Sequence, residues 1–212
     1  MSTHEKQTFT QVYEYADHHS KLPWAHEHPS TFLKEIVEER GEPGQESFRV
    51  LDIGCGGGTD SVFMAAHGWD VTALDFIPKA LEMTSARAAE QGLSVTTVEA
   101  DITQWEPPGA FDLVLDHGLL HNMDPVRYPA YRECLMKCLA PGADFVILHW
   151  LKRTPEEQQS EMGPTRTSRE DVQAFFAPEL EEQNFAMEEY DGLPESVGGS
   201  MAQAYYWFKR TK

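Results

Sequence analysis

A glycine-rich stretch, Val50–Gly58, limits the possible fold of this chain more than any other feature. The residues from Val50 to Ile53 are mostly apolar, as at the end of a buried strand, and a helix is expected from Thr59. Four glycines fall between positions 54 and 58. Glycine adopts positive φ angles, and its missing Cβ lets a ligand lie against the backbone. A strand, a Gly-rich turn and a helix predict the first unit of a nucleotide-binding α/β fold.

The glycine spacing distinguishes between possible cofactors. The dinucleotide fingerprint is G-x-G-x-x-G, and its third glycine, counted from Gly54, would fall at Thr59. Asp60 would also repel a pyrophosphate at the start of the helix. A nicotinamide dehydrogenase is therefore disfavoured. The chain instead reads Asp52-x-Gly54-x-Gly56-x-Gly58. This pattern resembles the first motif of the class I S-adenosylmethionine-dependent methyltransferases, whose cationic cofactor suits an acidic turn.

Strands and helices alternate through the middle of the chain. Strands are expected at about 48–53, 70–75, 95–100, 111–116 and 144–149, with helices at about 59–67, 78–91 and 126–139. This alternation implies right-handed crossovers and a parallel sheet with helices on both faces. Segments 185–190 and 202–208 have no helix between them, which indicates an antiparallel pair. The resemblance implies a Rossmann-like α/β sheet of seven strands, mostly parallel, with an antiparallel last strand.

The first 44 residues differ from this pattern. Phe9 and Tyr13 lie at helical spacing, Pro23 and Pro29 then interrupt the chain, and Ser30 is expected to cap a second helix. The segment is polar, yet its aromatic side chains need a surface to bury against. We therefore expect residues 1–44 to form a helical cover over the site and residues 45–212 to form the methyltransferase domain, within a single globular unit.

Composition excludes several classes of protein. The formal net charge is −18, with 17 Lys and Arg against 35 Asp and Glu, which disfavours a nucleic-acid partner. No apolar run reaches about 18 residues, so no membrane span is expected. The start of the chain lacks the apolar core of a signal peptide, and three cysteines make no disulfide framework. These features predict a cytoplasmic protein.

The resemblance implies a cofactor role for several positions. The cofactor would be S-adenosylmethionine, with S-adenosylhomocysteine as the product. Asp75 would accept hydrogen bonds from both ribose hydroxyls, and Asp101 would accept one from the adenine amino group. The cofactor-binding residues predicted in this way are Asp52, Gly54, Cys55, Gly56, Gly58, Asp75, Phe76, Ile77, Asp101, Ile102 and Asp116. Elementary physics agrees, because ligands of open α/β sheets bind at the carboxyl ends of the strands.

Catalytic and substrate residues are expected around the end of the strand at 111–116. Asp116, His117 and His121 are the candidate catalytic group, with a histidine as the general base if the acceptor starts protonated. The candidate substrate residues are Trp24, His26, His149, Arg153 and Arg166, of which either arginine would hold a substrate carboxylate. Histidine is a common metal ligand, but no matched ligand set appears in the sequence, so no metal is expected.

A narrower resemblance concerns the acceptor. Residues 111–123, the segment Gly163–Arg166 and the Tyr205-Tyr206-Trp207 strand are similar to the thiopurine- and tellurite-type small-molecule methyltransferases. That group often has an acidic-Arg pair where this chain has Asp116-His117. We therefore expect methyl transfer to a small-molecule heteroatom, with a thiol first and nitrogen or oxygen as the alternatives. A non-catalytic protein that only binds S-adenosylmethionine is the alternative of another class.

Overall fold

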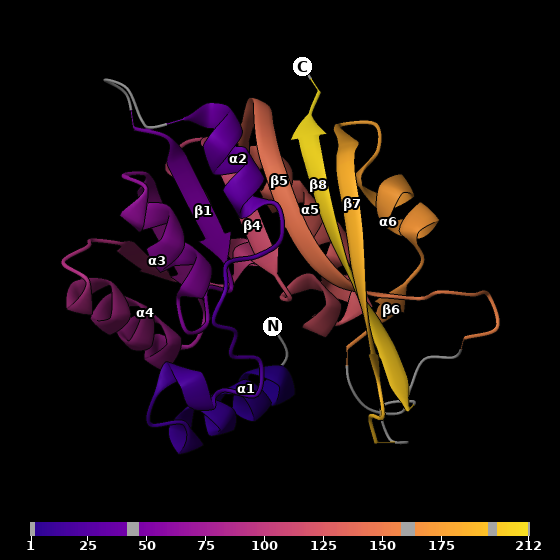
Figure 1. Cartoon of the computed structure of the whole chain (residues 1–212), viewed down its shortest axis with the longest axis horizontal. Helices are drawn as coiled ribbons and strands as arrows, with labels where there is room; N and C mark the ends of the chain where they lie inside the picture. The colour runs from indigo at the N-terminus through magenta and orange to yellow at the C-terminus, as the bar shows by residue number, and fades with distance from the viewer. Residues whose placement is uncertain (1–2, 42–46, 158–163, 195–198, 212) are drawn as a thin grey trace.

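The computed structural model describes residues 3–41, 47–157, 164–194 and 199–211. Its centre is an eight-stranded sheet in the order β3-β2-β1-β4-β5-β8-β7, with β6 paired to β5 off this path (Figure 1). The strands are β1 (Arg49–Ile53), β2 (Asp70–Asp75), β3 (Thr96–Glu99), β4 (Phe111–His117), β5 (Leu139–Leu151), β6 (Arg166–Thr167), β7 (Leu180–Asp191) and β8 (Ser200–Arg210). The predicted sheet is confirmed, and the eighth strand is the two-residue β6.

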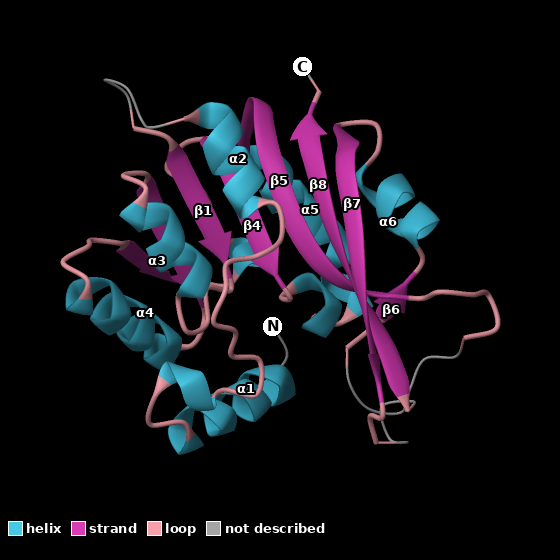
Figure 2. Ribbon diagram, viewed as in Figure 1, coloured by secondary structure: helices cyan, strands magenta, loops and turns pink. Residues whose placement is uncertain are grey.

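The direction of the strands also agrees with the prediction. Strands β1 to β5 are mutually parallel where they pair, whereas β8 runs antiparallel to both β5 and β7. The final strand therefore lies between β5 and β7. Figure 2 shows the long β7–β8 ribbon twisting beyond the rest of the sheet at one end. β7 begins at Leu180, five residues before the expected start.

Helices cover both faces of the sheet. The α-helices are α1 (Thr3–Tyr15), α2 (Leu33–Arg40), α3 (Thr59–Ala66), α4 (Pro78–Glu90), α5 (Tyr128–Cys138) and α6 (Arg169–Phe176). Short 3-10 turns are η1 (His19–Lys21), η2 (Ile102–Gln104), η3 (Leu120–Asn122) and η4 (Pro125–Arg127). One core cluster unites α2 and α3 with one face, and a second unites α5 and α6 with the opposite face.

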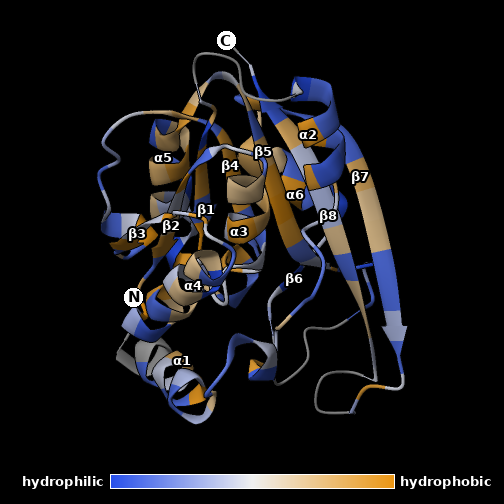
Figure 3. Ribbon diagram, turned by 60° about the vertical axis from the view of Figure 1, so that its left-hand side comes forward, coloured by the Kyte–Doolittle hydropathy of each residue, from blue (hydrophilic) through white to orange (hydrophobic). Residues whose placement is uncertain are grey.

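The two cores follow the alternation of side chains along each strand. In β8, Tyr205 and Trp207 belong to the cluster with α2 and α3, whereas Tyr206 and Phe208 belong to the cluster with α5 and α6. Figure 3 shows the central strands as hydrophobic and β7, at the edge, as more hydrophilic. Because the central strands are covered on both faces, they read as nearly continuous apolar runs in the sequence.

Local sequence signals mark some helix starts correctly and others not. Pro78 begins α4, at the expected position, and Ser168 caps α6 by accepting a hydrogen bond from Asp171 N. The prediction that Ser30 caps the next helix is wrong. The residue that precedes α2 is instead Phe32, in a left-handed conformation with φ 76° and no side-chain cap, and Ser30 lies two residues before it with its N donating to Asp60.

Helix α2 is part of the sheet's own core. Leu33 and Ile36 are fully buried there, and burying such side chains contributes about 1.5–3 kcal/mol each. Arg40 is also ion-paired with the buried Asp144 of β5, at 2.5 Å. The part of the chain that lies at the carboxyl edge of the sheet is instead α1, η1 and the loop to Ser30, below β1 in Figure 1.

Candidate functional site

The glycine turn between β1 and α3 forms one wall of a cavity. Gly56 has φ 55°, and a Cβ there would lie 3.4 Å from the Tyr13 hydroxyl and 3.5 Å from Trp24 Nε1. Gly58 has φ 75°, and its Cβ would lie 2.7 Å from Thr84 Oγ1. A side chain would thus intrude on the cavity at Gly56 and on helix α4 at Gly58. The motif spacing is accounted for by backbone conformation and close packing.

A cavity of about 820 Å³ opens at the carboxyl ends of the parallel strands. Six predicted cofactor residues line it: Gly54, Gly56, Asp75, Phe76, Asp101 and Ile102. Five others are not among the lining residues: Asp52, Cys55, Gly58, Ile77 and Asp116. Asp52 and Cys55 instead border a smaller hollow of about 40 Å³ beside the turn. Most, though not all, of the predicted cofactor set therefore meets at one cavity.

Asp75 closes β2 at the edge of this cavity. Its carboxylate accepts hydrogen bonds from Gly56 N at 3.1 Å and Ile77 N at 2.9 Å, which hold the glycine turn beside the start of α4. Burial raises the pKa of Asp75 to about 6. Each carboxylate oxygen has a second lone pair, so the group keeps acceptor capacity for a ligand.

Asp101 also lines the cavity, but it has partners of its own. It caps η2 by accepting a hydrogen bond from Thr103 N at 3.1 Å. Arg127 Nη2 lies 2.6 and 2.5 Å from its two oxygens. Any ligand amino group must therefore share this carboxylate with Arg127.

Asp116 does not lie where the sequence placed it. Its carboxylate points away from the cavity lining and accepts hydrogen bonds from the backbone of residues 118–120 and from the Tyr131 hydroxyl at 2.6 Å. Burial raises its pKa to about 6. Adjacent strand residues point to opposite faces, so Asp116 and His117 cannot both face the same space. Against our prediction, Asp116 holds the turn after β4.

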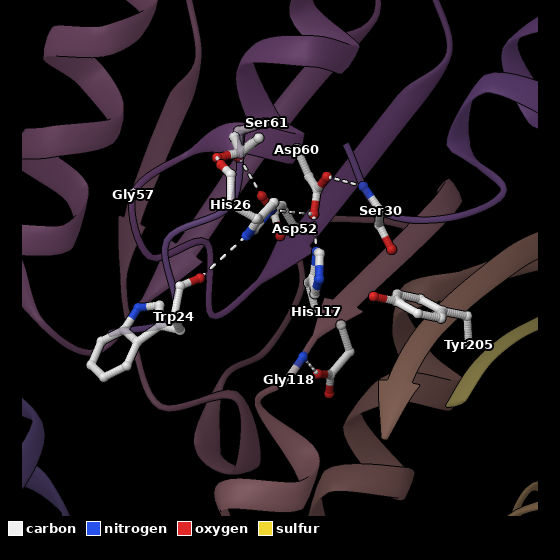
Figure 4. Close-up of polar contacts among 12 residues, drawn as sticks. Trp24, His26, Ser30, Asp52, Gly57, Asp60, Ser61, His117, Gly118 and Tyr205 are labelled. Atoms are coloured by element: carbon white, nitrogen blue, oxygen red, sulfur yellow. Dashed lines mark hydrogen bonds and ion pairs between the residues drawn. The ribbon is translucent and has the colours of Figure 1, made fainter. Parts of the chain in front are cut away.

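His117 lies on the cavity side and meets two residues from distant segments. Its Nδ1 is 2.7 Å from Asp60 Oδ2, and its ring lies against that of His26, with centroids 4.1 Å apart and an interplanar angle of 38°. His26 Nε2 is 3.7 Å from the same Asp60 oxygen, while Ser30 N donates to the other at 2.6 Å. Figure 4 shows the two rings converging on the carboxylate, with Tyr205 nearby.

This His26–Asp60–His117 cluster shifts the pKa values of its members. Burial alone would raise the pKa of Asp60, but the two histidines outweigh burial and hold it below its ordinary value. Burial would likewise lower the pKa of His26, but Asp60 raises it. Neighbouring Asp52, which accepts a 2.5 Å hydrogen bond from Ser61, has its pKa raised to about 7 by burial and by the charge of Asp60.

The other two candidate histidines lie deeper. His121 lines the cavity, but burial lowers its pKa well below the ordinary value, so it is a weak proton acceptor. His149 is buried and is not among the lining residues, although Leu148 and Trp150 on either side of it are. Strand alternation turns His149 to the opposite face, where burial lowers its pKa to about 4. Its predicted contact with substrate therefore lacks support.

Neither predicted substrate arginine lines the cavity. Arg153 pairs with Glu157 at 2.9 Å and with Glu189 at 3.4 Å. Arg166 pairs with Glu157 at 2.6 Å and stacks over Trp150. Both guanidinium groups thus hold the β5–β6–β8 region together. Trp24, in contrast, lines the cavity as predicted and packs edge-on against Phe9 and Tyr13.

The far wall of the cavity is apolar and aromatic. Its residues come mainly from β5, β7 and β8: Leu148, Trp150, Glu188, Tyr190, Met201, Gln203 and Tyr205. Among the lining residues that the structure describes, the only Lys or Arg is Arg127, which Asp101 already neutralises. This wall suits an apolar molecule and offers no cation to a carboxylate or phosphate.

Comparison with known proteins agrees with this geometry. Residues 50–142 match a family described as "Methyltransferase domain". The chain is 30% identical over 131 residues to a 2-heptyl-1-hydroxyquinolin-4(1H)-one methyltransferase of Mycobacteroides abscessus, covering 61% of this chain and 56% of that protein. It is 26% identical over 158 residues to a probable thiol methyltransferase 2 of Arabidopsis thaliana, covering 74% and 67% respectively.

A solved structure extends the likeness to nearly the whole chain. It was described for the conversion of a disulfide bond into a thioacetal group during echinomycin biosynthesis, and it covers 97% of this chain and 92% of its own, with 25% identity and a TM-score of 0.70. Residues 50–142 therefore form a methyltransferase domain, and the chain has the fold of the class I S-adenosylmethionine-dependent methyltransferases.

The methyltransferase domain identifies S-adenosylmethionine as the cofactor. The chain spans little more than half the length of the first relative, 56% of it, so that relative's activity does not transfer directly.

None of the described helices is long and apolar enough to cross a membrane. Sequence reasoning on this methyltransferase missed Asp60 as a partner of the histidines, because an acidic residue in the first turn of a helix usually signals only favourable charge.

Proposed function

We propose that this chain transfers a methyl group from S-adenosylmethionine to a heteroatom of a small apolar molecule and releases S-adenosylhomocysteine. One observation carries the proposal. A single cavity of about 820 Å³ joins the glycine turn and Asp75 on one side to the aromatic wall on the other, with His117 among its lining residues. Methyl transfer requires the two reactants to be held in line at short distance, which a shared cavity favours.

The cofactor half of the cavity supports a specific orientation. Asp75 would bind the ribose hydroxyls, and Phe76 and Ile102 would lie against the adenine. The methionine part would then lie along Gly54 and Gly56, with its sulfonium directed toward His117. Asp75 and Asp101 are both at the adenosine end of the cavity, where their carboxylates would accept hydrogen bonds from the ribose hydroxyls and the adenine amino group.

A thiol is our first choice of acceptor, and a hydroxyl or nitrogen is the alternative. The relative in Arabidopsis is named for a thiol, whereas that in Mycobacteroides is named for a hydroxyquinolone, so both kinds of heteroatom occur among relatives. The apolar wall supports an aromatic or aliphatic acceptor in either case. Because both arginines are paired outside the cavity, we no longer propose that they hold a substrate carboxylate.

The test is incubation of the full chain with methyl-labelled S-adenosylmethionine and a matched panel of acceptors. The panel pairs each aromatic thiol with the corresponding phenol, aniline and benzoic acid. We expect labelled S-methyl or O-methyl products by mass spectrometry and none on the carboxylate. Cofactor binding by calorimetry without any labelled product would instead indicate a protein that only binds S-adenosylmethionine.

We also propose that α1 and the loop to Ser30 cover the bound cofactor. Phe9 and Tyr13 line the cavity, and Phe9 meets Phe76 edge-on with ring centroids 6.1 Å apart. Tyr13 and Ile77 share a small core with the start of α4. Cofactor should therefore slow hydrogen exchange in this segment, and equal exchange with and without cofactor would contradict a cover.

A further inference from the structure

We propose that His26, Asp60 and His117 bind one divalent transition-metal ion at the wall of the cavity. One nitrogen of each histidine and one carboxylate oxygen of Asp60 all lie within 4.8 Å of one another. The three residues come from the loop before α2, the first turn of α3 and the end of β4. Their separation along the chain explains why no ligand set is visible in the sequence.

The carboxylate is placed as a metal ligand would be. Asp60 is only 3% exposed, and a buried charge must be paired or bound to a metal. Ser30 N holds Oδ1 in place at 2.6 Å. Oδ2 faces both imidazoles, 2.7 Å from His117 Nδ1 and 3.7 Å from His26 Nε2. A small outward shift of His117 would put all three ligand atoms around one ion.

A second observation comes from His26. Its Nε2 is closed to solvent and has no hydrogen-bond partner among the described residues. A buried polar atom left unsatisfied costs free energy, and an ion between His26 and Asp60 would satisfy it. The hydrogen bond that His117 donates to Asp60 satisfies one imidazole but leaves Nε2 of the second one without a hydrogen-bond partner in the part of the chain that the structure describes.

The surrounding contacts hold the proposed ligands in place. Thr59 Oγ1 donates to the His26 carbonyl at 3.0 Å, and Arg87 donates to the same hydroxyl oxygen at 2.6 Å. The two histidine rings lie in contact, tilted by 38° to each other. Supporting hydrogen bonds of this kind orient ligands around metals and contribute to affinity.

The donor set indicates the class of ion. Imidazole nitrogens favour zinc, cobalt and nickel over magnesium, which prefers oxygen ligands. Three protein ligands also leave a zinc-type ion one open position. His26 and His117 both line the large cavity, so that position would face the acceptor.

The ion's role, unlike its binding, rests on the proposed methyl transfer. The ion would lower the pKa of an acceptor thiol or hydroxyl. The proton would pass to water, and the heteroatom would then take the methyl carbon as its bond to the sulfonium sulfur breaks.

Titration calorimetry of the EDTA-treated full chain with Zn²⁺ tests the site. We expect one ion per chain, no comparable binding of Mg²⁺, and a visible absorption band when Co²⁺ is used. His26→Gln and His117→Gln should each weaken Zn²⁺ binding by at least about tenfold. His67→Gln is the matched control, since His67 is exposed at the end of α3 and should leave binding unchanged.

Two results would overturn the site: no Zn²⁺ binding by the parent chain, or binding that persists in the His26→Gln/His117→Gln double variant. Thermal melting of each variant without metal shows whether it is folded. Cofactor affinity measured on the same samples separates this inference from the proposed function. If S-adenosylmethionine binds and methyl transfer proceeds in EDTA while Zn²⁺ does not bind, only the metal site fails.

Discussion

The two halves of the cavity are built in different ways. The cofactor half consists of the glycine turn and of residues that follow consecutive parallel strands: Gly54 and Gly56 after β1, Asp75 and Phe76 at and after β2, and Asp101 and Ile102 after β3. The acceptor half is assembled from the loop before α2, the end of β4, and β5, β7 and β8. The first half depends on topology, whereas the second depends on which side chains face inward.

The halves also differ in charge. Carboxylates stand at the cofactor end, whereas the acceptor wall is mostly apolar, with Glu188 as its acidic member. Histidines 26 and 117 lie between them. If this division is right, substitutions at the cofactor end should weaken cofactor binding, whereas substitutions near the acceptor should lower turnover and leave cofactor affinity nearly constant.

The largest effect is expected at the boundary between the halves. His117→Gln should lower turnover by about 10²–10⁴-fold, the range typical of groups that assist proton removal, with cofactor affinity nearly constant. His67→Gln, on the surface of α3, should change neither quantity. Steady-state kinetics and calorimetry on both variants check this. A large loss of cofactor affinity in His117→Gln would show that the halves are not separate.

The next effect concerns the cofactor half. Asp75→Ala should weaken S-adenosylmethionine binding by ~1.5–3 kcal/mol, because hydrogen bonds to a charged group are lost. The matched control is Asp70→Ala, at the exposed start of the same strand. Calorimetry measures both, with thermal melting as a check on folding. Unchanged affinity in Asp75→Ala would remove this residue from the ribose site.

The raised pKa of Asp75 predicts a pH dependence of cofactor affinity. The pKa of Asp75 is raised to about 6 by burial, so the group gains a proton as the pH falls through 6 and loses its attraction for the cofactor. If only the ionised form binds, affinity at pH 5 should be roughly tenfold weaker than at pH 7.5.

Asp75→Asn distinguishes this group from its neighbours. Asp52 and Asp116 also have raised pKa values, about 7 and about 6, but neither lines the cavity. The variant should therefore show much less change in affinity between pH 5 and 7.5. A slope equal to that of the parent chain would assign the titration to another residue.

The smallest effect is expected at Arg153. Its ion pairs with Glu157 and Glu189 are at the surface, and such pairs contribute about 0–1 kcal/mol. Arg153→Ala should change the acceptor KM by less than about twofold, whereas Trp150→Ala, in the acceptor wall, should raise it more. A strong rise in KM for Arg153→Ala, confined to acidic acceptors, would restore the role predicted from sequence.

The interpretation of individual residues shows where sequence reasoning fails. The glycine turn and the acid that closes β2 lie at the cavity, where the sequence placed them, because their position depends on local backbone geometry at a strand end. Asp116 was misplaced because its neighbour His117 was assigned to the same space, although side chains alternate along β4. Arg153 and Arg166 were misinterpreted because the sequence does not show that both guanidinium groups pair with Glu157.

The sequence by itself determined the fold class, the parallel strands of the sheet, the antiparallel pair at its C-terminal end and the glycine-rich turn. These features follow from periodic patterns and from short motifs whose residues remain neighbours in space. Only the tertiary structure decided which histidine faces the cavity, that Asp60 joins His26 to His117, and that the arginines are held elsewhere. The contacts among His26, Asp60 and His117 join residues 34 to 91 positions apart, and no local pattern encodes them.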